Sequence, residues 1–96
     1  MYPSRRARTD PNQKEIAEAL RRAGALVYYI RWPLDLVVVF RGKVELLEVK
    51  APMGVLNDNQ KRIVQDMAYK GYWPRVVRSA EEALRAIGAI DEPSPG

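Results

Sequence analysis

The spacing of apolar residues predicts a helix at the start of the ordered chain. Apolar side chains recur at helical spacing over positions 16–23. Asp10 suits the N-cap of such a helix, Pro11 suits its first position, and Gly24 suits its end. The sequence therefore predicts a helix between these two boundaries, preceded by a basic arm over residues 1–9.

Three strand patterns follow the predicted helix. Positions 26–30 are rich in β-branched and aromatic residues, and positions 34–40 are apolar except for Asp35. The residues Arg41-Gly42-Lys43 form a tight-turn signal that leads into a third strand over positions 44–50. An almost continuous apolar run such as 34–40 is typical of a strand that is covered on both faces.

The second half of the chain repeats the helix and strand signals. Proline and glycine predict a loop over positions 51–55, and Asn57 with Gln60 has the spacing of a helix capping box. That helix should run to about residue 70, a fourth strand should occupy 72–77, and Ser79 with Glu82 should cap a last helix to about residue 87. The order predicts an α/β domain with a mixed sheet and helices on both faces.

Composition narrows the function classes. The 96 residues suffice for one domain, expected over 10–90 with a disordered tail at 91–96. The sequence holds no cysteine and no histidine, which excludes thiolate or imidazole zinc sites and histidine-based triads. A metal would have oxygen ligands, as Mg²⁺ or Mn²⁺ does. No signal peptide or membrane span is visible, so a cytoplasmic location is expected.

The net charge is weakly informative about partners. A formal charge of +4 favours a polyanionic partner such as DNA, although many small proteins are mildly basic for solubility alone. Arg31, Lys61 and Arg62 flank the candidate site described next and could contact phosphates. For each of them, a solvated surface position is the alternative.

Asp35, Glu48 and Lys50 are the residues that carry candidate chemistry. Asp35 interrupts a buried strand, where a carboxylate is costly unless it is paired or coordinated. Folding the strands at the intervening turn brings it beside Glu48, and Lys50 projects from the same face as Glu48. The two carboxylates and the Val49 carbonyl could hold Mg²⁺, and Lys50 could orient water or stabilise negative charge on a phosphate. The alternative is a structural ion pair between Glu48 and Lys50.

Together these residues resemble a known family. Pro33-Leu34-Asp35 followed by Glu48-Val49-Lys50, in the order helix, three strands, helix, strand, resembles the PD-(D/E)XK nucleases. The pattern over 10–88 is most similar to VRR-NUC (virus-type replication-repair nuclease) domains and archaeal-type Holliday junction resolvases. The resemblance implies a restriction-endonuclease-like fold, metal ligation by Asp35, Glu48 and the Val49 carbonyl, and a catalytic Lys50. Leu56 and Gln60 match a further family signal, which implies that Gln60 supports the metal or phosphate. The alternative for Gln60 is a capping role alone.

The sequence departs from the family pattern at two places. Leu34 separates the usual proline–aspartate pair, and no glycine-rich loop precedes it. The family often carries a glutamate on the first helix, and here helical geometry puts Gln13 nearer the sheet than Glu15. Gln13 is therefore the candidate for that position, with a capping role as its alternative.

Three functions stay open at this stage. The first is a Mg²⁺- or Mn²⁺-dependent DNA endonuclease that acts on branched structures in replication, recombination or repair. The second is a DNA-binding module that has the same fold without cleavage, and the third is a small structural protein. A homodimer is expected, with the aromatic edge over positions 28–32 as a possible interface.

Overall fold

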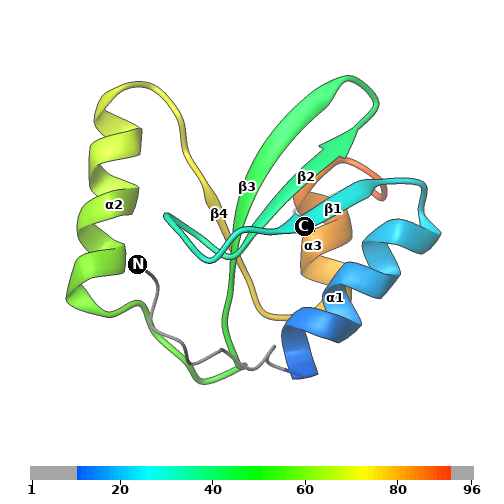
Figure 1. Cartoon of the computed structure of the whole chain (residues 1–96), viewed down its shortest axis with the longest axis horizontal. Helices are drawn as coiled ribbons and strands as arrows, with labels where there is room; N and C mark the ends of the chain where they lie inside the picture. Colours follow the sequence, from blue (N-terminus) through cyan, green and yellow to red (C-terminus); the bar gives the residue numbers. More distant parts are fainter. Residues whose placement is uncertain (1–10, 92–96) are drawn as a thin grey trace, which may run out of the picture.

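The computed structural model describes residues 11–91, which form a four-stranded sheet with helices on both faces (Figure 1). The predicted α/β class and the helix–three strands–helix–strand–helix order are confirmed. The elements in chain order are α1 (Pro11–Arg22), β1 (Leu26–Tyr29), β2 (Leu36–Phe40), β3 (Lys43–Val49), α2 (Asp58–Tyr69), β4 (Arg75–Val77) and α3 (Ala80–Ala86).

The sheet has the order β1-β2-β3-β4. β1, β2 and β3 form an antiparallel meander, and β4 joins β3 in parallel after the crossover through α2. Phe40 pairs with Lys43, so the turn between β2 and β3 has only two central residues, Arg41 and Gly42. Both have positive φ, 51° and 81°, which matches the twist of a two-residue hairpin. This turn fixes which residues of β2 and β3 face each other.

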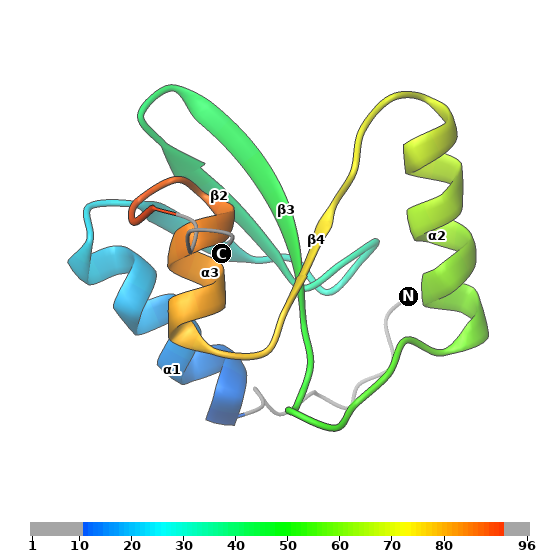
Figure 2. The same ribbon diagram turned by 180° about the vertical axis from the view of Figure 1, so that it is seen from behind.

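The core lies on the inner face of the sheet, beneath α1 and α3 (Figure 2). Because side chains alternate along a strand, every second residue of each strand points to this face. Helix α1 adds Ile16 and Leu20, which are fully buried. The strands supply the buried apolar residues Val27, Leu36, Val38, Phe40, Leu47, Val49 and Val77.

Helix α2 lies on the opposite, outer face of the sheet and is less tightly packed. Figures 1 and 2 both show it across the sheet from α1 and α3, and none of its residues is buried. The Tyr72 hydroxyl, three residues after this helix, accepts a hydrogen bond from Leu46 N–H at 2.7 Å and donates one to Glu45 at 2.9 Å. These contacts tie the segment after α2 to β3.

Several predicted strand boundaries shift: the strand predicted over 34–40 begins at Leu36, just after Asp35, and those predicted over 26–30 and 44–50 end at Tyr29 and Val49. Two further differences have a visible cause. The fourth strand begins at Arg75 rather than at residue 72, because the Tyr72 hydroxyl occupies the Leu46 N–H that a longer β4 would face. At α3, Ser79 caps the Glu82 N–H as predicted, but the Glu82 carboxylate accepts from Arg78 N–H instead of closing a reciprocal box on Ser79. The predicted capping box is therefore only half formed.

Residues 1–10 and 92–96 lie outside the described part of the chain. The predictions of a basic arm over 1–9, of an Asp10 cap and of most of the tail over 91–96 fall on these residues. Within residues 11–91, no helix has the length and hydrophobicity needed to cross a bilayer.

Candidate active site

The hairpin register places Asp35 and Glu48 at the same end of the outer sheet face. Val37 pairs with Leu46, and side chains alternate between the two faces along a strand. Asp35, two residues before Val37, therefore lies on the same face as Glu48, two residues after Leu46. Lys50, two further along, projects from that face as well. The site is thus formed where the β2–β3 pair ends, on the side of the sheet that faces α2.

The Asp35 carboxylate is held against β3. Its Oδ2 accepts the Val49 N–H at 2.8 Å, and its backbone N–H donates to the Leu47 carbonyl at 3.2 Å. On the other side, Ile30 N–H donates to the Asp35 carbonyl at 2.9 Å. In an extended strand the N–H and C=O of one residue point the same way, so the Val49 carbonyl also lies on the Asp35 side of β3. Two carboxylates and this carbonyl therefore share one edge.

Glu48 is a buried acid with two polar partners. Its side chain is only 2% exposed, and its Oε2 lies 3.3 Å from Lys50 Nζ and 2.7 Å from Gln60 Nε2. Burial raises the pKa of Glu48 from its ordinary 4.5 to about 7, and the nearby charge of Asp35 acts in the same direction. Lys50 opposes this effect without cancelling it. The positive charge of Lys50 therefore does not fully compensate the two neighbouring acids.

Gln60 serves two purposes that the sequence offered as alternatives. Asn57 Oδ1 accepts the Gln60 N–H at 2.8 Å, and Gln60 Oε1 accepts the Asn57 N–H at 3.0 Å, so the predicted capping box of α2 is formed. The other end of the same amide, Nε2, donates to Glu48. The cap thereby fixes the orientation of an amide that reaches into the site, and it joins the first turn of α2 to the buried acid.

This donor set fits a hard divalent cation. The ligands within reach are carboxylate and carbonyl oxygens, which Mg²⁺ and Mn²⁺ prefer. Burial and the nearby charge of Asp35 both raise the pKa of Glu48, and a cation bound between the two carboxylates would offset both effects. Within residues 11–91, no group of three or more acidic, histidine or cysteine side chains is gathered. Further ligands would come from the backbone, substrate or water.

The other predicted site residues lie on α1, in the segment before Asp35 and on α2. Gln13, in the first turn of α1, is half-buried, whereas Glu15 is exposed, as the helical geometry predicted. Arg31 is exposed and has a left-handed φ of 63° in the segment before Asp35. Lys61 and Arg62 are exposed on α2 directly after Gln60. The three cations thus come from the segment before β2 and from α2.

One further residue at the site, Asn12, was not predicted from the sequence. Asn12 Nδ2 donates to the Lys50 carbonyl at 2.9 Å, although the two residues are 38 positions apart. In the sequence, this asparagine was only part of the predicted start of the first helix. No local pattern predicts where the first turn of a helix contacts the end of a distant strand.

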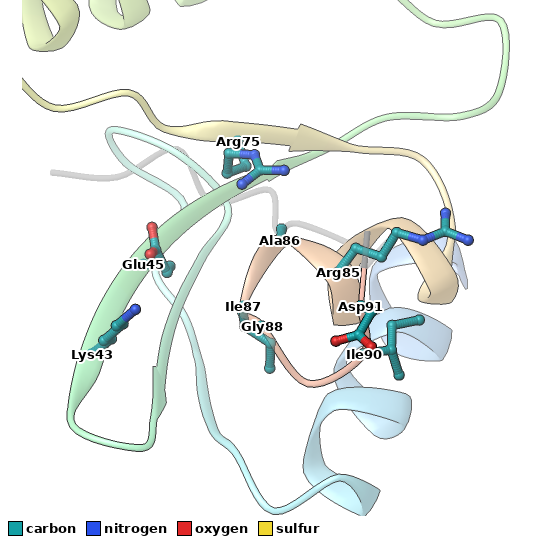
Figure 3. A pocket seen from close by; sticks show the side chains of 9 residues that line it. All are labelled: Lys43, Glu45, Arg75, Arg85, Ala86, Ile87, Gly88, Ile90 and Asp91. Atoms are coloured by element: carbon teal, nitrogen blue, oxygen red, sulfur yellow. The ribbon is translucent and has the colours of Figure 1, made fainter. Parts of the chain in front are cut away.

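A separate hollow of about 440 Å³ lies on the inner side of the sheet, between β3 and the end of α3 (Figure 3). It is lined by both signs of charge, with Lys43, Arg75 and Arg85 beside Glu45 and Asp91. Arg85 is paired with Glu81 within α3. None of the predicted site residues lines this hollow, so it is distinct from the carboxylate site.

Comparison with known proteins supports a nuclease-family domain. A solved structure titled "VRR_NUC domain" is similar to this chain, with a TM-score of 0.65 and 26% sequence identity over 78% of this chain and 88% of that one. No family model matches the sequence, and no curated protein matches it. The chain therefore has the fold of a VRR_NUC domain, as the sequence motif suggested, and this fold generally implies a divalent metal.

Proposed function

We propose that this protein is a Mg²⁺- or Mn²⁺-dependent endonuclease that hydrolyses DNA phosphodiester bonds, with a preference for branched DNA in replication, recombination or repair. The observation that carries the proposal is the convergence of Asp35, Glu48 and Lys50 on one face of the sheet, with Gln60 donating to the buried acid. The similarity to a VRR_NUC domain supports it.

Each residue at the site has a chemical role in this proposal. Asp35, Glu48 and the Val49 carbonyl would hold the cation, which when bound lowers the pKa of water and offsets negative charge on the scissile phosphate. Lys50 is half-buried beside Glu48, where its ammonium can orient the attacking water and stabilise charge on a phosphate oxygen. Gln60 would keep the Glu48 carboxylate oriented. Gln13 would take the place of the glutamate that the family often carries on its first helix.

Exposed cations near the site would supply the affinity for DNA. Arg31, Lys61 and Arg62 are exposed and would contact backbone phosphates, which adds binding energy without reading sequence. Each such contact that is removed should reduce the slope of log affinity against log salt by about 1. Neutralising all three together should weaken binding to linear and branched DNA alike.

The alternative function is a DNA-binding module with the same fold and little or no cleavage. The observation that favours it is the half-buried Gln13, because a neutral amide at this place cannot replace the charge of the family's glutamate. Glu15, the nearest acid on α1, is exposed. The intact Asp35, Glu48 and Lys50 argue for cleavage.

One experiment separates these functions. Wild type, Asp35→Asn and Lys50→Ala are incubated with four-way junction, flap, single-stranded and plasmid DNA in Mg²⁺, Mn²⁺ or EDTA. Metal-dependent cleavage that disappears in both variants supports the nuclease. Binding that persists in EDTA, with no cleavage in any metal, supports the binding module. If the protein neither binds nor cleaves, both proposals are wrong.

A homodimer is proposed as the working form, joined along β1. β1 is an edge strand, and Leu26, Tyr28 and Trp32 are 56%, 55% and 70% exposed. An aromatic side chain buries about 150–250 Å² when covered, so this edge offers several hundred Å² toward the roughly 800 Å² that each partner gives to a standard interface. Sedimentation at micromolar concentration should show a dimer that Tyr28→Asp weakens. A wild-type protein that stays monomeric with and without DNA would refute it.

A further inference from the structure

Asn12 joins the first helix to the ends of two parallel strands. It is the second residue of α1, and its Nδ2 donates to the Lys50 carbonyl at 2.9 Å and to the Arg78 carbonyl at 3.4 Å. These carbonyls belong to the residues that directly follow β3 and β4. A single side-chain amide therefore bridges the two strands at the edge where the carboxylate site lies.

This contact completes the backbone restraint of Lys50. The Lys50 N–H donates to the Val77 carbonyl at 3.0 Å, and Asn12 holds the Lys50 carbonyl. The next three residues, 51–53, are exposed and belong to no helix or strand. Lys50 is thus the last residue held by the sheet before an exposed loop. Its side chain extends from this last restrained position, and its ammonium nitrogen lies 3.3 Å from Glu48 Oε2.

We propose that Asn12 is a positioning residue, which holds the end of β3 so that the Lys50 ammonium stays at the carboxylates. This inference rests on the proposed nuclease function, in which Lys50 acts on water and phosphate. Without the amide donor, the Lys50 carbonyl loses this partner, and only the Lys50 N–H still ties the end of β3 to β4. A catalytic group that is misplaced by about 1 Å can cost about 100-fold in rate, so one lost hydrogen bond at this point is sufficient to slow cleavage.

A purely structural role for Asn12 makes a different prediction. If the amide only ties α1 to the sheet, its loss lowers stability and reduces activity equally whether or not Lys50 is present. If it acts through Lys50, its effect on the rate disappears once the lysine is gone. A double-mutant cycle therefore separates the two roles.

The cycle compares wild type, Asn12→Ala, Lys50→Ala and the double variant in single-turnover cleavage with saturating metal. Asn12→Ala should lower the cleavage rate by about 10- to 100-fold, with the Kd for DNA almost unchanged, and it should have no further effect in the Lys50→Ala background. Asn12→Asp, which keeps the shape but loses the donor, should be at least as slow. Asn59→Ala is the matched control, because Asn59 is the exposed second residue of α2. Rates that are unchanged in Asn12→Ala, or effects that add fully, overturn the proposal.

A second readout does not depend on cleavage. In protein carrying ¹³C-labelled lysine, the two Hε protons of a fixed side chain give separate signals, and those of a freely rotating one coincide. The Lys50 signals should be separate in wild type and should merge in Asn12→Ala, while those of exposed Lys14 stay the same. Unchanged Lys50 signals refute the positioning role. If wild type cleaves no DNA, the proposed function fails, and this measurement still decides whether Asn12 fixes Lys50.

Discussion

Replacing Glu48 with glutamine should stabilise the metal-free protein while it abolishes cleavage. Glu48 is 2% exposed, and its pKa is raised to about 7 by burial and by Asp35. The folded protein therefore holds a proton that the unfolded chain has already released above its ordinary pKa of 4.5. Glutamine keeps an oxygen for the Gln60 Nε2 donor and carries no charge. The substitution thus removes the free-energy cost of burying a charge and retains the shape of the side chain.

The size and the sign of this effect follow from the two pKa values. Below pH 4.5 Glu48 is protonated in both the folded and the unfolded state, so its burial costs no free energy through charge. Between 4.5 and about 7 the stability falls as the pH rises, because only the folded state still holds the proton. Above about 7 both states are ionised and the full cost remains. At about 1.4 kcal/mol per pKa unit, this cost is on the order of 3 kcal/mol.

Urea unfolding followed by circular dichroism in EDTA, from pH 5 to pH 8.5, measures this cost. The free energy of unfolding of Glu48→Gln minus that of wild type should be small at pH 5 and should approach a few kcal/mol at pH 8.5. Glu18→Gln, a change at an exposed acid of α1, should give a difference within about 0.5 kcal/mol at every pH. Mg²⁺ at pH 8.5 should stabilise wild type and leave Glu48→Gln unaffected, because a cation that binds the folded state adds stability.

A different outcome would refute the reasoning. If Glu48→Gln is less stable than wild type at pH 8.5, the buried carboxylate is compensated by its present partners and has no need of a cation. A difference that does not change with pH would show that the Glu48 pKa is not raised. Either result removes the electrostatic support for a metal site between Asp35 and Glu48.

Three further predictions concern single side chains. Lys50→Ala should reduce cleavage by about 100-fold or more while the Kd for DNA changes little, since the ammonium acts on reacting groups; single-turnover rates and gel-shift titration check this. Asn57→Ala should destabilise the protein by about 1 kcal/mol because it removes the N-cap of α2, and amide exchange should quicken first in the opening turn of that helix. Tyr72→Phe leaves the Leu46 N–H without its acceptor and should cost about 1–2 kcal/mol in thermal unfolding, with Tyr69→Phe, at a 90% exposed ring, as the neutral control.

The site was predictable from sequence as far as local rules reach. The turn at Arg41 and Gly42 sets the pairing of β2 with β3, and the two-residue period of strands then places Asp35 and Glu48 on one face. The cap of α2 was also visible, because Asn57 and Gln60 have the spacing of a capping box. In each case the interacting residues lie in one element or in two elements joined by a short turn.

Contacts that depend on how distant elements pack were not predictable. Asn12 meets Lys50 only because the first turn of α1 lies at the end of β3, and nothing in the first helix encodes that placement. The late start of β4 has the same origin, since Tyr72 reaches back to Leu46 from beyond α2. Gln60 shows a third limit. A sequence pattern offers the cap and the site as alternatives, whereas a side-chain amide has two ends and can serve both.

The hydrophobic pattern of β2 also bears on how the protein assembles. Its continuous apolar run predicted a strand covered on both faces, and the inner-facing residues of β2, Leu36, Val38 and Phe40, are all buried in the core. The outer face has two apolar rows beside the carboxylates, Leu26–Val39–Val44 and Tyr28–Val37–Leu46, which follow from the pairing of β1, β2 and β3. Within residues 11–91, α2 leaves the first and last strands of these rows poorly covered, with Leu26, Tyr28 and Val44 more than half exposed. The pattern of β2 predicts burial on both faces, and a second copy of the chain would bury this outer side. The proposed dimer is joined along β1 because the exposed Leu26 and Tyr28 belong to that strand.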